Sequence, residues 1–127
     1  MAVSDLKQSK MMAHLLDALA DGQDIGHYGR LTFVMVARHF LSENELIEQL
    51  QQDRDFSADE AKRLYQQVSE KGYSPPQRDR ILEWQQQQDF AICPDADDPD
   101  ACNVYQDLQF PSDVYESISE YYEEKAS

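Results

Sequence analysis

The feature that most constrains the fold is a single apolar run, from Leu31 to Leu41, in an otherwise polar chain. Hydrophobic residues make up 41% of the sequence and charged residues 28%, so this run must lie at the centre of any core. Its apolar side chains cover most of the circumference of a helix, which is typical of a buried helix. A buried strand over 32–36 is the alternative, because β-branched residues are dense there. The pattern continues for about three turns and favours the helix.

Within this run, three side chains form the densest apolar stripe, and we expect them to be almost fully buried: Phe33, Val36 and Phe40. If Phe40 is buried, its replacement by alanine should cost roughly 3–5 kcal/mol of stability. That loss would be close to the whole stability of a small domain.

Helix starts are marked by serine followed three residues later by Glu or Gln, the spacing of a capping box. Ser42 with Glu45 predicts a helix to about residue 52, and Ser57 with Glu60 predicts a helix to about residue 70, closed by Gly72. A third start is predicted at residues 74–77, where Pro75 suits the first helical position. That helix is expected to extend to about residue 88.

The two ends of the chain carry further helical patterns. Residues 3–20 predict one helix, with an apolar stripe that includes Leu15, Leu16 and Leu19. A last helix is predicted to begin at Ser112 or Asp113. Between them, residues 89–111 predict a long ordered acidic loop, because six of its side chains are too apolar to stay in water: Phe90, Ile92, Val104, Tyr105, Leu108 and Phe110.

These elements predict an all-α fold, a compact single domain over residues 1–127. Five to six short helices are expected around the buried central helix at about 30–41. Residues 1–88 form the helical core in this interpretation. Residues 89–127 add the acidic loop and the C-terminal helix.

The charge distribution limits the partners. The chain has 25 acidic and 11 basic residues, a net charge of −14, and residues 81–127 hold 12 acidic residues against 1 basic. Such a field repels phosphate backbones, so direct nucleic-acid binding is not expected, even though 43–70 has a helix-turn-helix-like pattern. A membrane span is not expected, since no apolar run is long enough. Without a signal-peptide core at the N-terminus, a soluble, cytoplasmic protein is expected.

No pattern points to catalysis, and the sequence predicts no catalytic residue, metal site or cofactor. Cys93 and Cys102 lack the close spacing of zinc ligands, and ordinary thiols are expected in a reducing cytoplasm. The aspartates of 95–100 fail as an EF-hand, because its required Gly and Glu positions fall on Asp100 and Gln106. Arg38, on the central helix, is expected to pair with a carboxylate.

The C-terminal third carries the predicted binding site, because tyrosines beside acidic residues are typical of interfaces. We expect a non-catalytic interaction protein, an assembly, adaptor or regulatory factor, whose protein partner offers a basic-rimmed groove. A nucleic-acid-mimicking inhibitor and a small metal or redox protein using Cys93 and Cys102 are the alternatives. The expected partner-binding residues are Tyr105, Tyr115, Ile118, Tyr121, Tyr122, Glu116, Glu120, Glu123 and Glu124.

Overall fold

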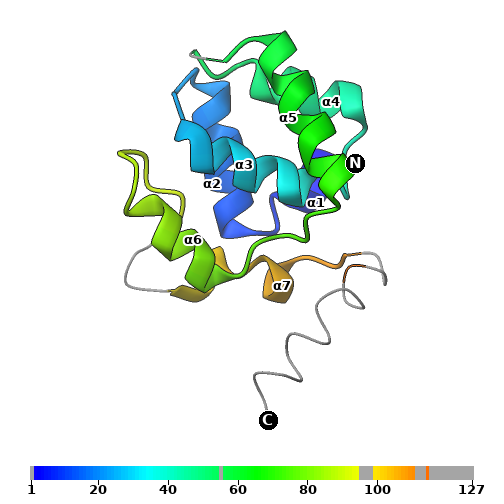
Figure 1. Ribbon diagram of the computed structural model, residues 1–127. Helices are drawn as coiled ribbons and strands as arrows, with labels where there is room; N and C mark the ends of the chain where they lie inside the picture. Colours follow the sequence, from blue (N-terminus) through cyan, green and yellow to red (C-terminus); the bar gives the residue numbers. More distant parts are fainter. Residues whose placement is uncertain (1, 55, 95–98, 111–113, 115–127) are drawn as a thin grey trace.

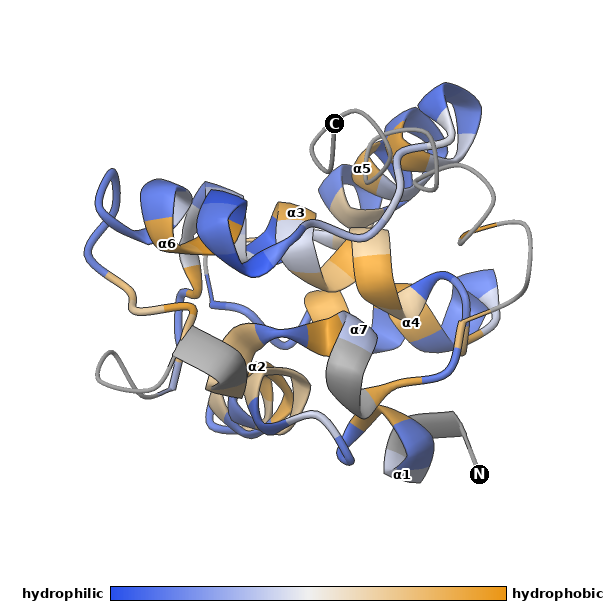
Figure 2. Cartoon of the chain, turned by 90° about the horizontal axis from the view of Figure 1, so that it is seen from below, coloured by the Kyte–Doolittle hydropathy of each residue, from blue (hydrophilic) through white to orange (hydrophobic). Residues whose placement is uncertain are grey.

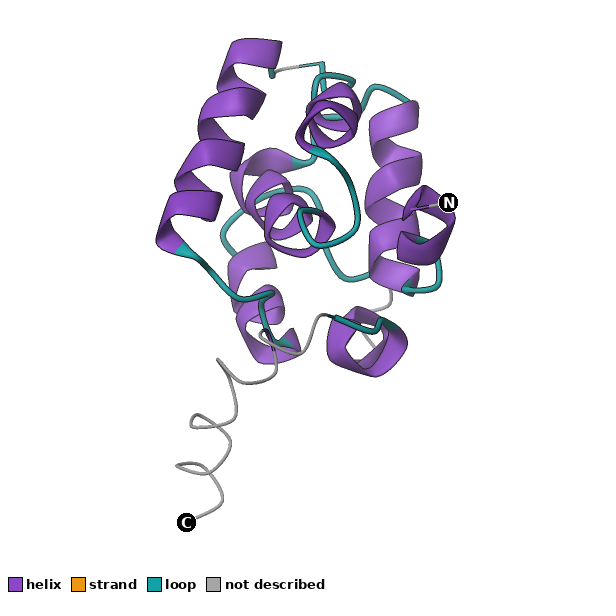
Figure 3. Ribbon diagram, turned by 90° about the vertical axis from the view of Figure 1, so that its right-hand side faces the viewer, coloured by secondary structure: helices purple, strands orange, loops and turns teal. Residues whose placement is uncertain are grey.

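The computed structural model describes residues 2–54, 56–94, 99–110 and 114 (Figure 1). This part of the chain is helical and contains no strand (Figure 3), which confirms the predicted all-α class. The elements are α1 (Ala2–Leu6), α2 (Lys10–Ala20), α3 (Gly26–Ala37), α4 (Glu43–Leu50), α5 (Ala58–Lys71), α6 (Arg78–Gln85), a 3-10 turn η1 (Pro99–Cys102) and α7 (Val104–Asp107). The predicted C-terminal helix lies outside the described residues except for Val114, which is buried.

Helix α3 is the centre of the fold, as the apolar run predicted. It packs against α2, α4, α5 and α6, and Figure 2 shows these helices around it. The helix begins and ends earlier than the predicted range of about 30–41. At its end, His39 N–H donates to the Val36 carbonyl and Phe40 N–H to the Ala37 carbonyl, at 3.3 and 2.9 Å. These bonds span three residues and tighten the chain into a turn that stops the helix.

The early end of α3 changes the environment of Phe40. Phe33 and Val36 are completely buried, as expected. Phe40 is only partly buried, so its predicted full burial is wrong. It follows the helix and packs its ring edge-on against Phe110, with centroids 5.4 Å apart. Phe33 is therefore the position where truncation to alanine should cost roughly 3–5 kcal/mol.

The capping prediction holds at two of three positions. Both Ser42 and Ser57 accept a hydrogen bond from the third residue of their helix, and the glutamate there accepts one from the serine N–H. The third start is wrong: α6 begins at Arg78, and Gln77 precedes it without a side-chain cap bond. The ring of a proline disfavours helical backbone angles at the residue before it. Pro76 therefore works against a helix start at Pro75, and the helix begins at Arg78.

The predicted first helix is divided in two at Ser9. The buried Ser9 donates its N–H to the Leu6 carbonyl at 3.1 Å, ending the first turn. Its hydroxyl accepts from Met12 N–H at 3.3 Å and caps α2. A serine that bonds local backbone competes with a continuous helix. The break therefore follows from one side chain inside the apolar pattern.

The described part of the predicted acidic loop is ordered against the core. The ring of Phe90 stacks on His14 of α2 with centroids 5.2 Å apart, and His14 Nε2 lies 2.9 Å from the Ala91 carbonyl oxygen. Within this segment, the structure has the helical turns η1 and α7 where the sequence predicted an irregular loop. Its apolar side chains explain the packing, since four of them are buried: Ile92, Val104, Leu108 and Phe110.

Candidate functional site

A groove of about 690 Å³ lies between α3, α5 and α6. Its floor comes from α3, where His27, Leu31 and Met35 follow one another at four-residue spacing. Side chains four residues apart lie on the same face of a helix. Leu64 and Gln67 of α5 form one wall. The sequence therefore places one apolar stripe of the central helix against the groove.

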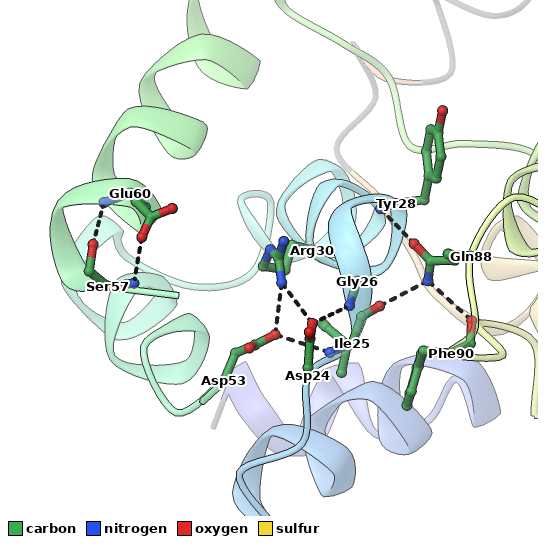
Figure 4. A network of polar contacts seen from close by, with 10 residues as sticks. All are labelled: Asp24, Ile25, Gly26, Tyr28, Arg30, Asp53, Ser57, Glu60, Gln88 and Phe90. Carbon is green, nitrogen blue, oxygen red and sulfur yellow. Dashed lines mark hydrogen bonds and ion pairs between the residues drawn. The ribbon is translucent and has the colours of Figure 1, made fainter. Parts of the chain in front are cut away.

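The opposite wall is α6, which a single glutamine ties to the start of α3. Gln88 Nε2 donates to the carbonyl oxygens of Ile25 and Phe90, at 2.9 and 3.1 Å. Its Oε1 accepts from Tyr28 N–H at 2.9 Å (Figure 4). These three bonds satisfy both ends of the side-chain amide. They hold the chain just after α6 against the start of α3.

Trp84 is the largest side chain of the α6 wall. The Tyr28 ring stacks on it with centroids 5.5 Å apart and planes 19° apart. The guanidinium of Arg80 lies 6.0 Å from its ring centre, within cation–π distance. Both contacts limit the orientations of the indole. A rigid aromatic wall loses little conformational entropy when something binds against it.

Tyr73 lies at the rim of the groove and is 40% exposed. It is the one large hydrophobic side chain classed as exposed in the described part of the chain. Gly72, with φ +65°, turns the chain at the end of α5, and Arg38 Nη2 donates to the Tyr73 carbonyl oxygen at 2.9 Å. The backbone that presents this tyrosine is therefore held in place.

The charges of the groove gather on α6. Asp79 and Glu83 are exposed at its rim, beside Arg80. Asp79 is 3.8 Å from Arg78, but both side chains are largely exposed, and such pairs contribute little. The site can therefore receive apolar side chains on its floor, and its α6 rim presents two carboxylates and one guanidinium.

The structure places one of the expected partner-binding residues, Tyr105. It is partly buried, its ring lies 5.4 Å from that of Phe110, and its hydroxyl donates to the Pro75 carbonyl oxygen. Tyr105 thus packs within the fold, and its hydrogen bond holds the segment at Pro75 that forms the rim of the groove. The other expected residues lie outside the described part: Tyr115, Glu116, Ile118, Glu120, Tyr121, Tyr122, Glu123 and Glu124.

The two cysteines come together in the fold. Both side chains are buried. Burial, followed by the hydrogen bond and charge interaction with Cys93, raises the pKa of Cys102 to about 12. Within the described residues, no three or more His, Cys, Asp or Glu side chains cluster as metal ligands would. The aspartates at 95, 97 and 98 lie outside that part.

In the described part of the chain, the buried ion pair is formed by another arginine than Arg38, for which a carboxylate partner was predicted. The described hydrogen bond of Arg38 goes to a carbonyl oxygen rather than to the expected carboxylate. The buried pair is made by Arg30 with Asp53, which sequence reasoning missed. The groove was missed as well. The spacing of Leu31 and Met35 was visible, but it was assigned to the core.

Comparison of the chain with protein-family models, curated proteins and solved structures found no match. None of the described helices has the length and apolar character needed to cross a bilayer. The groove and the charge of the chain are therefore the grounds for a functional inference.

Proposed function

We propose that this protein is a non-catalytic interaction protein, an adaptor or regulatory factor, which holds an amphipathic segment of a protein partner in the groove between α3, α5 and α6. The observation that carries the proposal is the exposed ring of Tyr73 at the rim of that groove. Tyrosine is enriched among the residues that contribute most to binding. An exposed aromatic beside an apolar depression is typical of an interaction site.

The lining favours a peptide over a small polar ligand. Small-molecule sites orient their ligand through a few polar groups that converge inside the pocket. Here the charged and polar side chains of the lining are mostly on the surface, while Met35 and Leu64 are only 8% exposed each. A helical segment laid in such a groove inserts its residues at i, i+3, i+4 and i+7. Three helices around one apolar floor suit that mode.

Charge indicates the rest of the partner's chemistry. The net charge of −14 attracts basic proteins and accelerates their association. Asp79 and Glu83 place part of this charge at the groove itself. We infer a partner segment with an apolar face flanked by Lys or Arg. The tyrosines and glutamates of 115–124 add a second contact region to this proposal.

Trp84 provides the test, because it is the single tryptophan of the chain and lines the groove. The probe is a synthetic peptide with leucine at i, i+3, i+4 and i+7 and lysine elsewhere. The control peptide has the same composition with its leucines scattered. We expect a saturable change in Trp84 fluorescence with the probe and affinity at least about tenfold weaker with the control. Equal affinities would contradict a groove that recognises an amphipathic face.

Matched variants locate the binding. Tyr73→Ala should weaken the probe about tenfold, whereas Tyr73→Phe, which keeps the ring, should change it little. Glu83→Gln should slow association and reduce its salt dependence more than Glu48→Gln. Glu48 is exposed on α4, away from the groove, and both changes remove one charge. Unchanged affinity in Tyr73→Ala, with the fold intact by circular dichroism, would contradict the proposal.

A further inference from the structure

Cys93 and Cys102 are the two cysteines of the chain, and the fold brings their thiols into contact. The side chains are hydrogen-bonded to each other, and their exposed fractions are 3% and 0%. Buried cysteine commonly serves as a small hydrophobic residue. Two buried thiols in contact are in addition arranged for a reaction with each other.

Both residues are held beside α6. Cys93 N–H donates to Gln85 Oε1, at the end of α6, at 2.8 Å. Cys102 ends η1, which packs against both α2 and α6. The two backbones are thus anchored on the same helix. A disulfide needs residues that are held in place beside each other, because its bond length and dihedral angle are narrowly defined.

We propose that Cys93 and Cys102 are a redox pair, which a low-molecular-weight disulfide such as glutathione disulfide converts into an intramolecular disulfide. This inference is independent of the proposed function. The disulfide would restrain the fold, because it would join the chain after α6 to η1. Tyr105 follows η1, and its hydroxyl donates to the Pro75 carbonyl oxygen behind the groove rim.

The reaction proceeds by two exchanges. A thiolate of the protein attacks one sulfur of glutathione disulfide, forms a mixed disulfide and releases one glutathione thiolate, which takes up a proton. The second protein thiol loses its proton and attacks the protein-side sulfur, releasing the second glutathione. The protein loses two electrons and two protons, and one glutathione disulfide becomes two glutathiones. Either protein thiol can make the first attack in its thiolate form, because the thiolate is the nucleophile.

The test is an equilibrium measurement, because buried thiols react slowly. The full chain is incubated to constancy at several ratios of reduced to oxidised glutathione, with and without urea. Samples are quenched in acid and analysed by intact mass spectrometry. We expect a species that has lost two hydrogens. Half-conversion to this disulfide species should need an oxidised-to-reduced glutathione ratio at least about tenfold lower in the folded protein than in urea. The reason is that folding holds the two thiols together.

Two results would overturn the inference. One is a main product carrying glutathionyl groups; the other is a disulfide no easier to form in the folded chain than in urea. Single variants are the control for the pairing. Cys102→Ser and Cys93→Ser each keep one thiol, so neither should give a monomer that has lost two hydrogens. Peptide mapping without reduction distinguishes an intramolecular bond from a dimer.

Discussion

The carboxylate of Asp53 and the guanidinium of Arg30 form a buried ion pair that joins α3 to the end of α4. Arg30 Nη1 lies 3.1 Å from Asp53 Oδ2, and the exposed fractions of the two side chains are 13% and 0%. The same oxygen accepts from Ile25 N–H at 3.0 Å (Figure 4). Arg30 also contacts Asp24 Oδ1 at 3.0 Å, and its guanidinium lies 4.4 Å from the centre of the Phe56 ring.

Replacing Asp53 leaves the Ile25 N–H without this acceptor, and it leaves Arg30 paired with the more exposed Asp24. We therefore expect Asp53→Ala to lower the free energy of unfolding by roughly 3 kcal/mol. Urea denaturation measures it. The matched control is Asp17→Ala, which breaks an exposed pair with Lys7 at 3.9 Å and should cost less than about 1 kcal/mol. Similar losses in both variants would show that burial does not decide the strength of the pair.

Local features of the fold were predictable, and long-range ones were not. The caps at Ser42 and Ser57 need only residues three positions apart, so the sequence contains them completely. Arg30 and Asp53 are 23 residues apart, and nothing local indicates which carboxylate meets which arginine. The failed start at Ser74 is different. Its capping signal is present in the sequence, but Pro76 disfavours helical backbone angles at Pro75.

The groove could not be predicted for a related reason. Leu31 and Leu64 are apolar and occur at the helical spacing of core residues. Hydrophobic periodicity does not show which of these side chains line a groove between helices. The groove depends on where α6 lies. Gln88 contributes to that position through its hydrogen bonds with Ile25 and Tyr28, 60 or more residues away in the sequence, so no local pattern reveals it. The contact of Cys93 with Cys102 likewise depends on how the chain folds back between them.

Gly26 tests the role of Gln88. Its φ is +78°, and a Cβ there would lie 2.5 Å from Gln88 Oε1. The glutamine is held by three hydrogen bonds, so it cannot move aside without losing some of them. Gly26→Ala should combine backbone strain of about 1–2 kcal/mol with lost hydrogen bonds worth about 1 kcal/mol each.

Gly72→Ala is the control for Gly26→Ala, because its φ is +65° and no atom lies within 4 Å of the added Cβ. It should show backbone strain alone. Thermal or urea unfolding of the two variants separates the backbone strain from the loss of the Gln88 hydrogen bonds. Equal destabilisation would mean that Gln88 moves aside without losing stability and does not fix α6.

Glu45 gives a pH-dependent effect. Its hydrogen bonds from Ser42, the backbone one first, hold the pKa of the carboxyl below its ordinary value of 4.5. A lowered pKa in the folded state means that the cap contributes above the unfolded pKa and is lost as pH falls through the folded one. NMR titration of the Glu45 side chain should show the low pKa. Ser42→Ala removes the hydroxyl and keeps the backbone N–H, so it should raise the pKa only part of the way toward the ordinary value. An unmoved pKa would argue against the hydroxyl as a contributing cause.

Cys102 gives the opposite dependence at alkaline pH. Its pKa is raised by burial from 9.0 to about 12, so folding favours the protonated thiol. This contribution is complete below pH 9 and decreases as pH rises toward 12. Stability of the reduced protein should therefore fall more steeply above pH 9 than that of Cys102→Ala, measured by urea unfolding. Parallel curves would show that the thiol ionises equally easily in both states.

The most direct test of the proposed function maps where the leucine–lysine probe binds. Methyl and indole NMR signals are recorded on the labelled full chain during titration. The account predicts saturable shifts at Met35, Leu64 and Trp84, which line the groove. The methyl of Met12, buried in α2, should stay unshifted. Shifts concentrated elsewhere in the chain, with the signals of Met35, Leu64 and Trp84 unmoved, would contradict a partner-binding groove between α3, α5 and α6.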